Sequence, residues 1–294
     1  MSLDLHQPSS GARLRGLMRL LRPRQWVKNG FVLAPLLFTG QFADARAMVA
    51  AALAALLFCV ASSATYVVND WRDIARDRAH PTKRYSRPLA SGAVTPAMAA
   101  LLLALLYAIL IASAFALPRV LAVIGIYVLL NLAYSFGLKH QPVIDIFVVA
   151  SGFVLRVIAG AQALAVPVSS WMFVTTLCLA LYLAAVKRRQ ELLQAGSDAR
   201  EVLGKYSLPL IERYAEMSAT GALVFYSLFV MNAHPELIVT IPLVLFGLFR
   251  YWYIVEREGG GESPTDTLLT DWQLQLVALA WVVLCAVRLW KKMP

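Results

Sequence analysis

Three oxygen-bearing side chains recur at every fourth residue where one apolar run of the chain ends. Asn69, Asp73 and Asp77 lie at i, i+4 and i+8. On a helix that continues out of this run they share one face, because four residues turn it by about 400°. Two carboxylates and an amide oxygen one turn apart suit Mg²⁺, which prefers oxygen ligands, usually keeps several waters and bridges substrate phosphates. The simpler interpretation is a solvated loop of mixed charge.

Basic side chains follow the acidic motif directly. Lys83, Arg84 and Arg87 are phosphate binders by type, because ammonium and guanidinium groups donate charge-assisted hydrogen bonds to phosphate oxygens. The shared helix face, the position at a helix end and the basic residues are hard to obtain together by chance. We therefore favour a Mg²⁺–diphosphate site at a membrane surface over a solvated loop.

The composition predicts an all-α, polytopic membrane protein. Of the 294 residues, 60% are hydrophobic and only 15% are charged, whereas soluble domains carry about 25% charged residues. The apolar runs are long enough to cross a bilayer as helices. They are continuous rather than alternating, which excludes a closed transmembrane barrel. The net charge of +10 reflects an excess of lysine and arginine. In a membrane protein these residues set the orientation of the chain and contact anionic lipid headgroups. We expect no nucleic acid partner, because no compact basic domain exists.

The chain is expected to have two parts. Residues 1–25 form an N-terminal part, in which residues 1–10 look disordered and residues 11–24 read as a basic amphipathic surface helix. Residues 26–294 form a single transmembrane catalytic domain with nine spans. We place the spans at 26–42, 46–69, 96–117, 119–137, 144–164, 170–187, 214–232, 236–254 and 272–290.

Lysine and arginine gather in alternate loops, which predicts the orientation. With the N-terminus inside, the inside loops 70–95, 138–143, 188–213 and 255–271 hold the charged clusters, and the outside loops are short and nearly uncharged. Lys291 and Lys292 are an exception to this charge distribution, because nine spans place them outside. The long inside loops are expected to build a cap over a shared cavity.

Several charges are costly to place in a membrane. Arg156 lies near the middle of the predicted fifth span, where an uncompensated charge costs roughly 2.5–3.5 kcal/mol on insertion scales. Asp145 faces the same way about 16 Å earlier along the helix axis. Either each has a partner on another helix or both line one cavity, and we favour the cavity. Lys28, beside Trp26 and Asn29, is expected to be a site residue, although snorkelling lysines at helix ends are common.

A second charged cluster follows the predicted sixth span. Lys187 and Glu191 are i, i+4 partners on one helix face, with Arg188 beside them. The usual enrichment of lysine and arginine at the cytoplasmic end of a span would also explain the basic residues. With Tyr182 inside the span and Glu191 beyond it, we favour a helix that stays ordered into the cap.

Two motifs carry a family resemblance. The pattern Asn-Asp-x-x-Asp-x-x-x-Asp over residues 69–77, with Arg-Pro-x-x-Trp-x-Lys over 22–28 upstream, resembles the UbiA-type superfamily of intramembrane prenyltransferases. This resemblance implies nine helices around a central cavity with a cytoplasmic cap. It also implies two aspartate-rich motifs that hold Mg²⁺ on an isoprenoid diphosphate. The sequence departs from that pattern, because a basic stretch over residues 187–191 replaces the second motif, and Asp198 and Glu201 do not restore it.

One branch of the superfamily is more similar than the rest. Segments 78–84, 134–139, 145–160 and 263–271 are similar to the decaprenyl-phosphate phosphoribosyltransferases, which join 5-phosphoribosyl diphosphate (PRPP) to a polyprenyl phosphate. The resemblance implies these two substrates, a bacterial inner membrane and an active site that faces the cytoplasm. The substrate-binding residues are then expected to be Lys28, Tyr66, Lys83, Arg84, Tyr134, Lys139, Asp145, Arg156, Lys187, Arg188 and Glu191.

The missing acidic motif agrees with these substrates, since PRPP carries a 5-phosphate besides its diphosphate and the lipid brings another phosphate. Under this hypothesis Asp73, Asp77 and Asn69 hold catalytic Mg²⁺ on the diphosphate, and the basic residues cover the phosphates. Lys83 and Arg84 are assigned to the diphosphate, Lys187 and Arg188 to the 5-phosphate, and Lys28, Lys139 and Arg156 to the lipid phosphate.

Two alternatives stay open at this point. One is an ordinary prenyltransferase that moves an isoprenoid to an aromatic or haem acceptor, against which the absent second motif argues. The other is a transporter or lipid carrier, against which the absence of broken helices in two matching halves argues. The sequence is also compatible with a homo-oligomer.

Overall fold

The computed structural model describes residues 10–195, 202–257, 261 and 263–290, and all regular structure within these ranges is helical. Eight helices in the described ranges are long and apolar enough to cross a membrane, which confirms the all-α multi-pass class. They are α3 (Ala45–Arg72), α6 (Pro96–Ser113), α7 (Pro118–Phe136), α8 (Ile144–Ala163), α9 (Ser170–Ala195), α10 (Leu208–Ala233), α11 (Ile241–Arg257) with the preceding η6 (Pro235–Thr240), and α13 (Trp272–Trp290).

Some sequence expectations cannot be compared with this structure. The disorder expected for residues 1–10 falls almost wholly outside the described residues, as do Asp198, Glu201, Lys291 and Lys292.

The segment predicted as the first span, residues 26–42, is broken rather than continuous. The 3₁₀-helix η1 (Pro23–Leu33) is followed by the short α2 (Ala34–Phe38) and by η2 (Gln41–Ala43). Pro35 lacks the N–H that a continuous helix needs, and Gly40 has a φ of 72°, which a glycine adopts without steric cost. The first of the nine predicted spans is therefore an irregular segment, and the other eight are continuous.

This broken segment packs against α3 and α8. Its approach to α8 is so close that a Cβ atom on Gly160 would lie 1.9 Å from the carbonyl oxygen of Val32. Backbone-to-backbone contact of this kind places η1 inside the bundle, where its polar side chains Lys28 and Asn29 can reach other helices.

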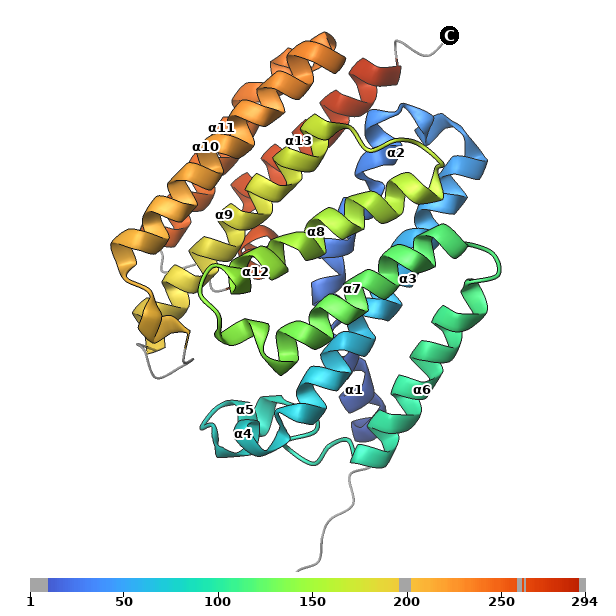
Figure 1. Ribbon diagram of the computed structural model, residues 1–294, viewed down its shortest axis with the longest axis vertical. Helices are drawn as coiled ribbons and strands as arrows, with labels where there is room; N and C mark the ends of the chain where they lie inside the picture. The colour runs from blue at the N-terminus through green and yellow to red at the C-terminus, as the bar shows by residue number, and fades with distance from the viewer. Residues whose placement is uncertain (1–9, 196–201, 258–260, 262, 291–294) are drawn as a thin grey trace, which may run out of the picture.

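The remaining helices form two groups joined by α8 (Figure 1). On one side α9 packs most extensively against α10, with α11 and α13 beside them, and on the other side α3 packs against α6 and α7. Because α8 contacts both α9 and α7, residues along it can meet side chains from either group.

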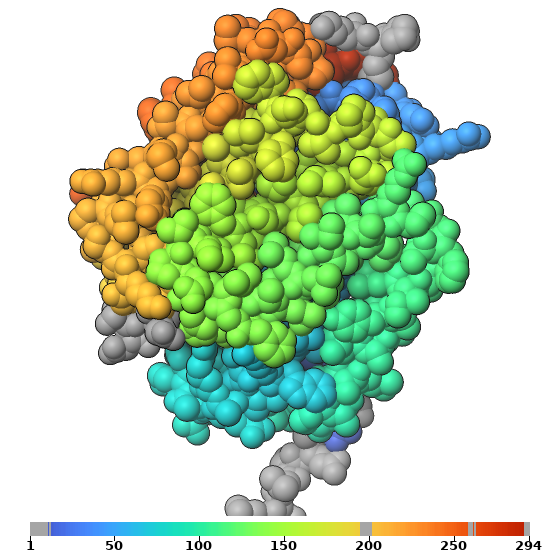
Figure 2. Space-filling view, in the orientation of Figure 1, coloured from blue at the N-terminus to red at the C-terminus, as the bar shows by residue number. Residues whose placement is uncertain are grey.

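The longer connections lie together at one end of the bundle, here called the charged end (Figure 1). They contain α4 (Ile74–Ala79) and α5 (Lys83–Ser86), η3 (Leu138–His140), η5 (Leu203–Lys205) and α12 (Pro264–Thr270). Figure 2 shows α4 and α5, in cyan, bulging from the lower part of the surface beneath the green side chains of α7. The connections of the predicted cap are thus side by side.

A helix, α1 (Ser10–Leu21), occupies the segment predicted as a surface helix. It buries Leu20 against α3 and α6 and ends before Pro23, and its place on the membrane surface stays a prediction. Helix α9 continues eight residues beyond the predicted span end at 187, to Ala195, so the helix does stay ordered past Glu191.

Candidate active site

The acidic motif lies at a helix break, so the prediction of one continuous helix through residues 69–77 is wrong in that detail. Helix α3 ends at Arg72, and Asp73 lies between α3 and α4. The backbone N–H of Asp73 still donates to the carbonyl of Asn69 at 3.0 Å, and that of Asp77 to the carbonyl of Asp73 at 2.8 Å. The three residues therefore keep their spacing of one turn.

The motif side chains differ in exposure and partners. Asp77 is buried, and Asp73 is half-buried with the guanidinium of Arg76 at 3.8 Å. The Oδ1 atom of Asn69 accepts a hydrogen bond from the hydroxyl of Ser135 on α7. Among the described residues, no three His, Cys, Asp or Glu side chains are grouped as a complete metal site. Two carboxylates and an amide would leave positions for water and phosphate oxygens, as Mg²⁺ prefers.

Asp70 lies beside this motif in an unusual environment. It is buried, and its Oδ1 atom accepts hydrogen bonds from Arg22 and, at 3.2 Å, from Arg87. Its Oδ2 atom is buried without a hydrogen-bond partner in the described part of the chain. An orphaned carboxylate oxygen is costly, and a cation beside the motif would satisfy it, so the donor set here fits a divalent metal.

Arg22 is held in place from several directions. Its φ of 54° lies in the left-handed region, which costs a non-glycine residue of order 1–3 kcal/mol and persists only where the surroundings over-determine it. Here the guanidinium binds Asp70 and lies 4.6 Å above the ring centroid of Tyr66. The ring of Tyr66, a predicted site residue, therefore contacts the guanidinium of Arg22 and helps to hold it in position.

A cavity of about 740 Å³ opens beside Asp70 at the charged end. Its walls come from α1, η1, α5 and α12. The charged residues lining it are mostly basic: Arg19, Arg22, Arg24, Lys83 and Arg87 against Asp70 and Asp266. Such a surplus of cations around an open cavity is typical of a site for a polyvalent anion.

A second group of cations lies deeper in the bundle around Lys28. Burial, and then repulsion from Lys187, Arg156 and Arg22, lowers the pKa of Lys28 to about 7, with Asp266 opposing the shift. Lys28 lies in η1, outside the eight spans. Asp70, Glu191 and Asp266 balance part of this positive charge, and the cations around Lys28 could bind a further phosphate.

Arg156 has partners on three elements. Its Nε donates to Oδ1 of Asn29 at 2.8 Å, and its Nη1 donates to the carbonyl of Gly152 at 2.7 Å. The guanidinium carbon lies 5.1–5.4 Å from the ring centroids of Phe58, Tyr127 and Phe153, an arrangement that stabilises a cation. From the sequence we favoured a cavity lined by both Arg156 and Asp145. The structure instead shows the other alternative, in which Arg156 has partners on other elements.

Asp145 likewise has its own partners. It is fully buried at the start of α8. Its Oδ2 accepts from Nε of Arg188 at 2.6 Å, and its Oδ1 accepts from the hydroxyl of Tyr206 at 2.6 Å. Burial, together with this hydrogen bond to Asp145, raises the pKa of Tyr206. The same hydroxyl accepts from the N–H of Val143 at 2.6 Å.

The guanidinium of Arg188 is almost fully engaged. Besides Asp145, it donates to Glu191 at 2.7 Å and to the hydroxyl of Tyr134 at 2.8 Å. Glu191 also lies 3.8 Å from Nζ of Lys187. Four predicted site residues, Tyr134, Asp145, Arg188 and Glu191, therefore form one buried polar network with Tyr206, here called the Asp145 network.

The structure brings most predicted residues to the charged end but not into one cluster. Arg84 is exposed and lies over the ring of Tyr85 at 4.9 Å, and it does not line the basic cavity. Lys139 lies in η3, beside His140, whose carbonyl accepts from Lys205 at 3.3 Å. Both remain predictions.

Sequence reasoning missed three contributors. Tyr206 and Tyr127 carried no motif signal, because a tyrosine in a helical membrane protein is common at any position. Ser135 lies next to Tyr134 in a segment already singled out, yet only its contact with Asn69 gives it a role.

Comparison with known proteins defines the class. Residues 31–265 match the UbiA prenyltransferase family, and the chain belongs to that family. It is 37% identical to the decaprenyl-phosphate phosphoribosyltransferase of Mycolicibacterium smegmatis over 94% of each chain. It is 38% identical to the enzyme of that name from Corynebacterium glutamicum, over 91% of this chain and 84% of the relative, and 36% identical to that from Mycobacterium tuberculosis, over 96% and 97%.

Solved structures share the fold. A UbiA homologue from Archaeoglobus fulgidus bound to GPP and Mg²⁺ superposes with a TM-score of 0.72 over 93% of this chain and 99% of that one. Its form bound to DMAPP and Mg²⁺ superposes with a TM-score of 0.69 over 94% and 99%, and both are 19% identical to this chain. At this identity the likeness concerns the arrangement of helices, and it agrees with the predicted all-α membrane fold.

Proposed function

We propose that this chain transfers the 5-phosphoribosyl group of PRPP to a polyprenyl phosphate of the decaprenyl type and releases pyrophosphate. Relatives that match nearly end to end carry the name of that activity. The observation that carries the proposal is the charge arrangement at one end of the bundle. A single acidic motif lies beside a cavity lined by five basic residues, with further cations around Lys28.

Mg²⁺ would be held by Asp73, Asp77 and Asn69, with Asp70 close by, and it would neutralise the diphosphate leaving group. Arg22, Lys83 and Arg87 line the adjoining cavity and would bind the diphosphate oxygens. Asp70 holds two of these three cations in position, because both arginines donate to its Oδ1 atom.

The deeper cations would receive the remaining phosphates. Lys187 and Arg156 each repel Lys28, so an anion near Lys28 would be favoured, which suits the lipid phosphate and the 5-phosphate. Arg156 would contribute its charge, since its Nε, Nη1 and Nη2 atoms also donate to protein groups. Arg188 is assigned a positioning role in place of direct phosphate binding, since its Nε, Nη1 and Nη2 atoms already donate to protein groups.

The reaction would need no general base. The lipid phosphate is already anionic, and one of its oxygens attacks the anomeric carbon of PRPP while the bond to the diphosphate breaks. In-line attack on α-PRPP gives a β-linked product. Catalysis then consists of positioning and charge stabilisation in a site sheltered from water.

The location follows from the charge distribution. The charged end carries the lysine- and arginine-rich connections, which are retained on the cytoplasmic side of a membrane. We infer a bacterial inner membrane with the charged end in the cytoplasm, where a soluble phosphorylated sugar donor is accessible.

A donor comparison tests the proposal. The purified protein is incubated with Mg²⁺ and decaprenyl phosphate plus labelled PRPP, and separately with labelled prenyl diphosphate plus an aromatic acceptor. The expected result is pyrophosphate release and a labelled lipid from PRPP alone. Release from the prenyl diphosphate alone would instead identify an ordinary prenyltransferase.

A further inference from the structure

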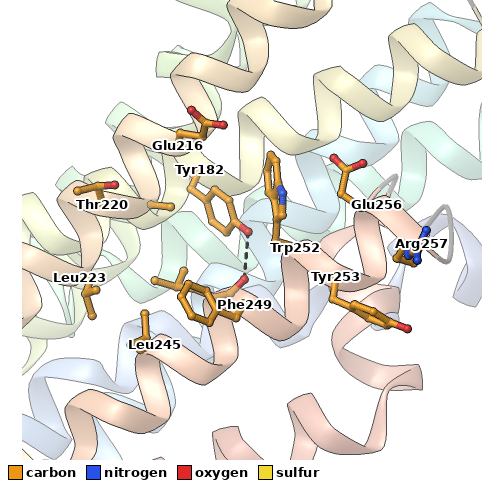
Figure 3. A pocket seen from close by; sticks show the side chains of 12 residues that line it. Tyr182, Glu216, Thr220, Leu223, Leu245, Phe249, Trp252, Tyr253, Glu256 and Arg257 are labelled. Carbon is orange, nitrogen blue, oxygen red and sulfur yellow. Dashed lines mark hydrogen bonds between the residues drawn. The ribbon is translucent and has the colours of Figure 1, made fainter.

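A groove of about 520 Å³ lies on the outer surface of α10 and α11, separate from the residues of the proposed active site. Figure 3 shows its lining side chains. Most of the lining is apolar, including Leu223 on α10 and Leu245 and Phe249 on α11. Tyr182 of α9 also lines the groove, where it is buried and its hydroxyl lies 3.5 Å from the carbonyl oxygen of Leu248.

The charges of the groove gather at one end. Glu216 on α10 and Glu256 and Arg257 on α11 are among its lining residues, and they lie toward the charged end of the bundle. From Glu216 to Leu223 the helix rises about 10 Å, and from Glu256 back to Leu245 about 16 Å. The groove therefore passes from polar to apolar along the helix axes, as a phospholipid does from headgroup to acyl chain.

The polar end has a specific charge pattern. Glu256 accepts from Nη2 of Arg189 at 2.7 Å, whereas exposed Glu216 makes no hydrogen bond or ion pair within the described chain. In Figure 3 the indole of Trp252 stands between the two glutamates. Arg189 also lies 5.9 Å from the centre of the Trp252 ring, so Glu216 is the lining carboxylate with which an added ammonium group could pair.

We propose that this groove binds a phospholipid with an ammonium headgroup, with phosphatidylethanolamine as the simplest example. The ammonium group pairs with Glu216, Arg257 is available to the lipid phosphate, and an acyl chain follows Leu223 and Leu245. A headgroup that lacks an ammonium group leaves Glu216 without a partner, so the groove favours this zwitterionic lipid over a purely anionic one such as the polyprenyl phosphate substrate.

Native mass spectrometry of the delipidated protein, titrated with phosphatidylethanolamine or with phosphatidylglycerol, tests the proposal. We expect one phosphatidylethanolamine to bind at least about tenfold more tightly than phosphatidylglycerol. Glu216→Gln should lose most of this preference. Leu223→Trp should abolish binding by filling the groove, whereas Val224→Trp, on the exposed neighbour outside the lining, should bind like the unaltered protein.

Leu245→Trp fills the groove from α11 instead of α10. This variant tests the same loss of binding if Leu223→Trp does not fold. Equal or tighter binding of phosphatidylglycerol would overturn the proposal, as would binding that survives both tryptophan substitutions. A dimer that forms through this face and excludes lipid would overturn it as well. None of these outcomes depends on phosphoribosyl transfer.

Discussion

At the scale of single residues, the carboxylates of the acidic motif differ in what they contact. Asp73 and Asp77 keep the spacing expected of metal ligands, whereas Asp70 binds Arg22 and Arg87. The sequence placed all three carboxylates in one motif and could not distinguish these roles. The distinction depends on Arg22, which comes from an element 48 residues earlier in the chain.

Replacing Asp70 with asparagine tests the positioning role. Asp70→Asn keeps the shape of the side chain but removes the charge that orients two arginines. We expect the KM for PRPP to rise about tenfold, with a smaller change in kcat and in the Mg²⁺ concentration needed for half-maximal activity. A loss of kcat that higher Mg²⁺ restores would show instead that Asp70 is chiefly a metal ligand.

Lys28 should make substrate binding depend on pH. Its pKa is lowered to about 7 in the free protein, so it is largely neutral at pH 8. A bound phosphate favours the charged form and raises this pKa, so binding takes up a proton and weakens as pH rises above about 7.

Calorimetry at pH 8 in buffers of different ionisation enthalpy measures this uptake, with farnesyl phosphate as a short lipid substrate. Lys28→Arg keeps the positive charge across this range, so the uptake should disappear. Proton uptake that persists unchanged in Lys28→Arg would exclude Lys28 as its source.

At the scale of elements, the Asp145 network joins the charged ends of α7, α8 and α9 to the segment before α10. The sequence predicted Tyr134, Asp145, Arg188 and Glu191 as substrate-binding residues, and in the structure they contact one another. The sequence did not reveal these contacts, because hydrogen-bond partners on different helices leave no periodic pattern.

Removing the carboxylate of this network should destabilise the protein strongly. Asp145→Ala leaves the guanidinium of Arg188 buried beside an empty position, and breaking a buried ion pair costs roughly 3–5 kcal/mol. Tyr206→Phe removes only one neutral donor to Asp145 and should cost about 1 kcal/mol. Thermal unfolding in detergent should rank the two variants in this order, and equal midpoints would contradict the role given to Asp145.

The approach of η1 to α8 is a second property of elements. Gly160→Ala would place a Cβ atom 1.9 Å from a backbone oxygen of η1, so the two elements must separate, and Lys28 with them. Gly125 on α7 has no atom within 4 Å of an added Cβ and provides the matched control. We expect Gly160→Ala to lower the unfolding temperature and the activity, and Gly125→Ala to leave both nearly unchanged. Identical behaviour of the two variants would contradict the contact.

At the scale of the whole molecule, span positions could be predicted well because bilayer thickness dictates the length of an apolar helix. The predicted spans match α3, α6, α7, α8 and α13 within a few residues at each end. The first span could not be predicted correctly, since its composition is apolar enough to cross a bilayer while Pro35 and its glycines break the helix. That broken segment brings Lys28 and Arg22 to the site.

The arrangement of charges over the whole molecule supports the central claim. In the proposed mechanism, acidic groups at one helix end would hold the leaving diphosphate through Mg²⁺, while cations from η1, α8 and α9 would receive the other phosphates. A UbiA fold with a basic stretch in place of the second acidic motif would thus accept a sugar diphosphate and a lipid phosphate together.

The most direct test is product formation by the purified protein from PRPP and decaprenyl phosphate, followed by mass spectrometry of the lipid. The account predicts a polyprenyl-phosphoryl-5-phosphoribose that forms with Mg²⁺, is lost with chelator, and falls by at least about 100-fold in Asp77→Asn, while the distant Glu236→Gln behaves normally. Undiminished, Mg²⁺-dependent product formation by Asp77→Asn would contradict it.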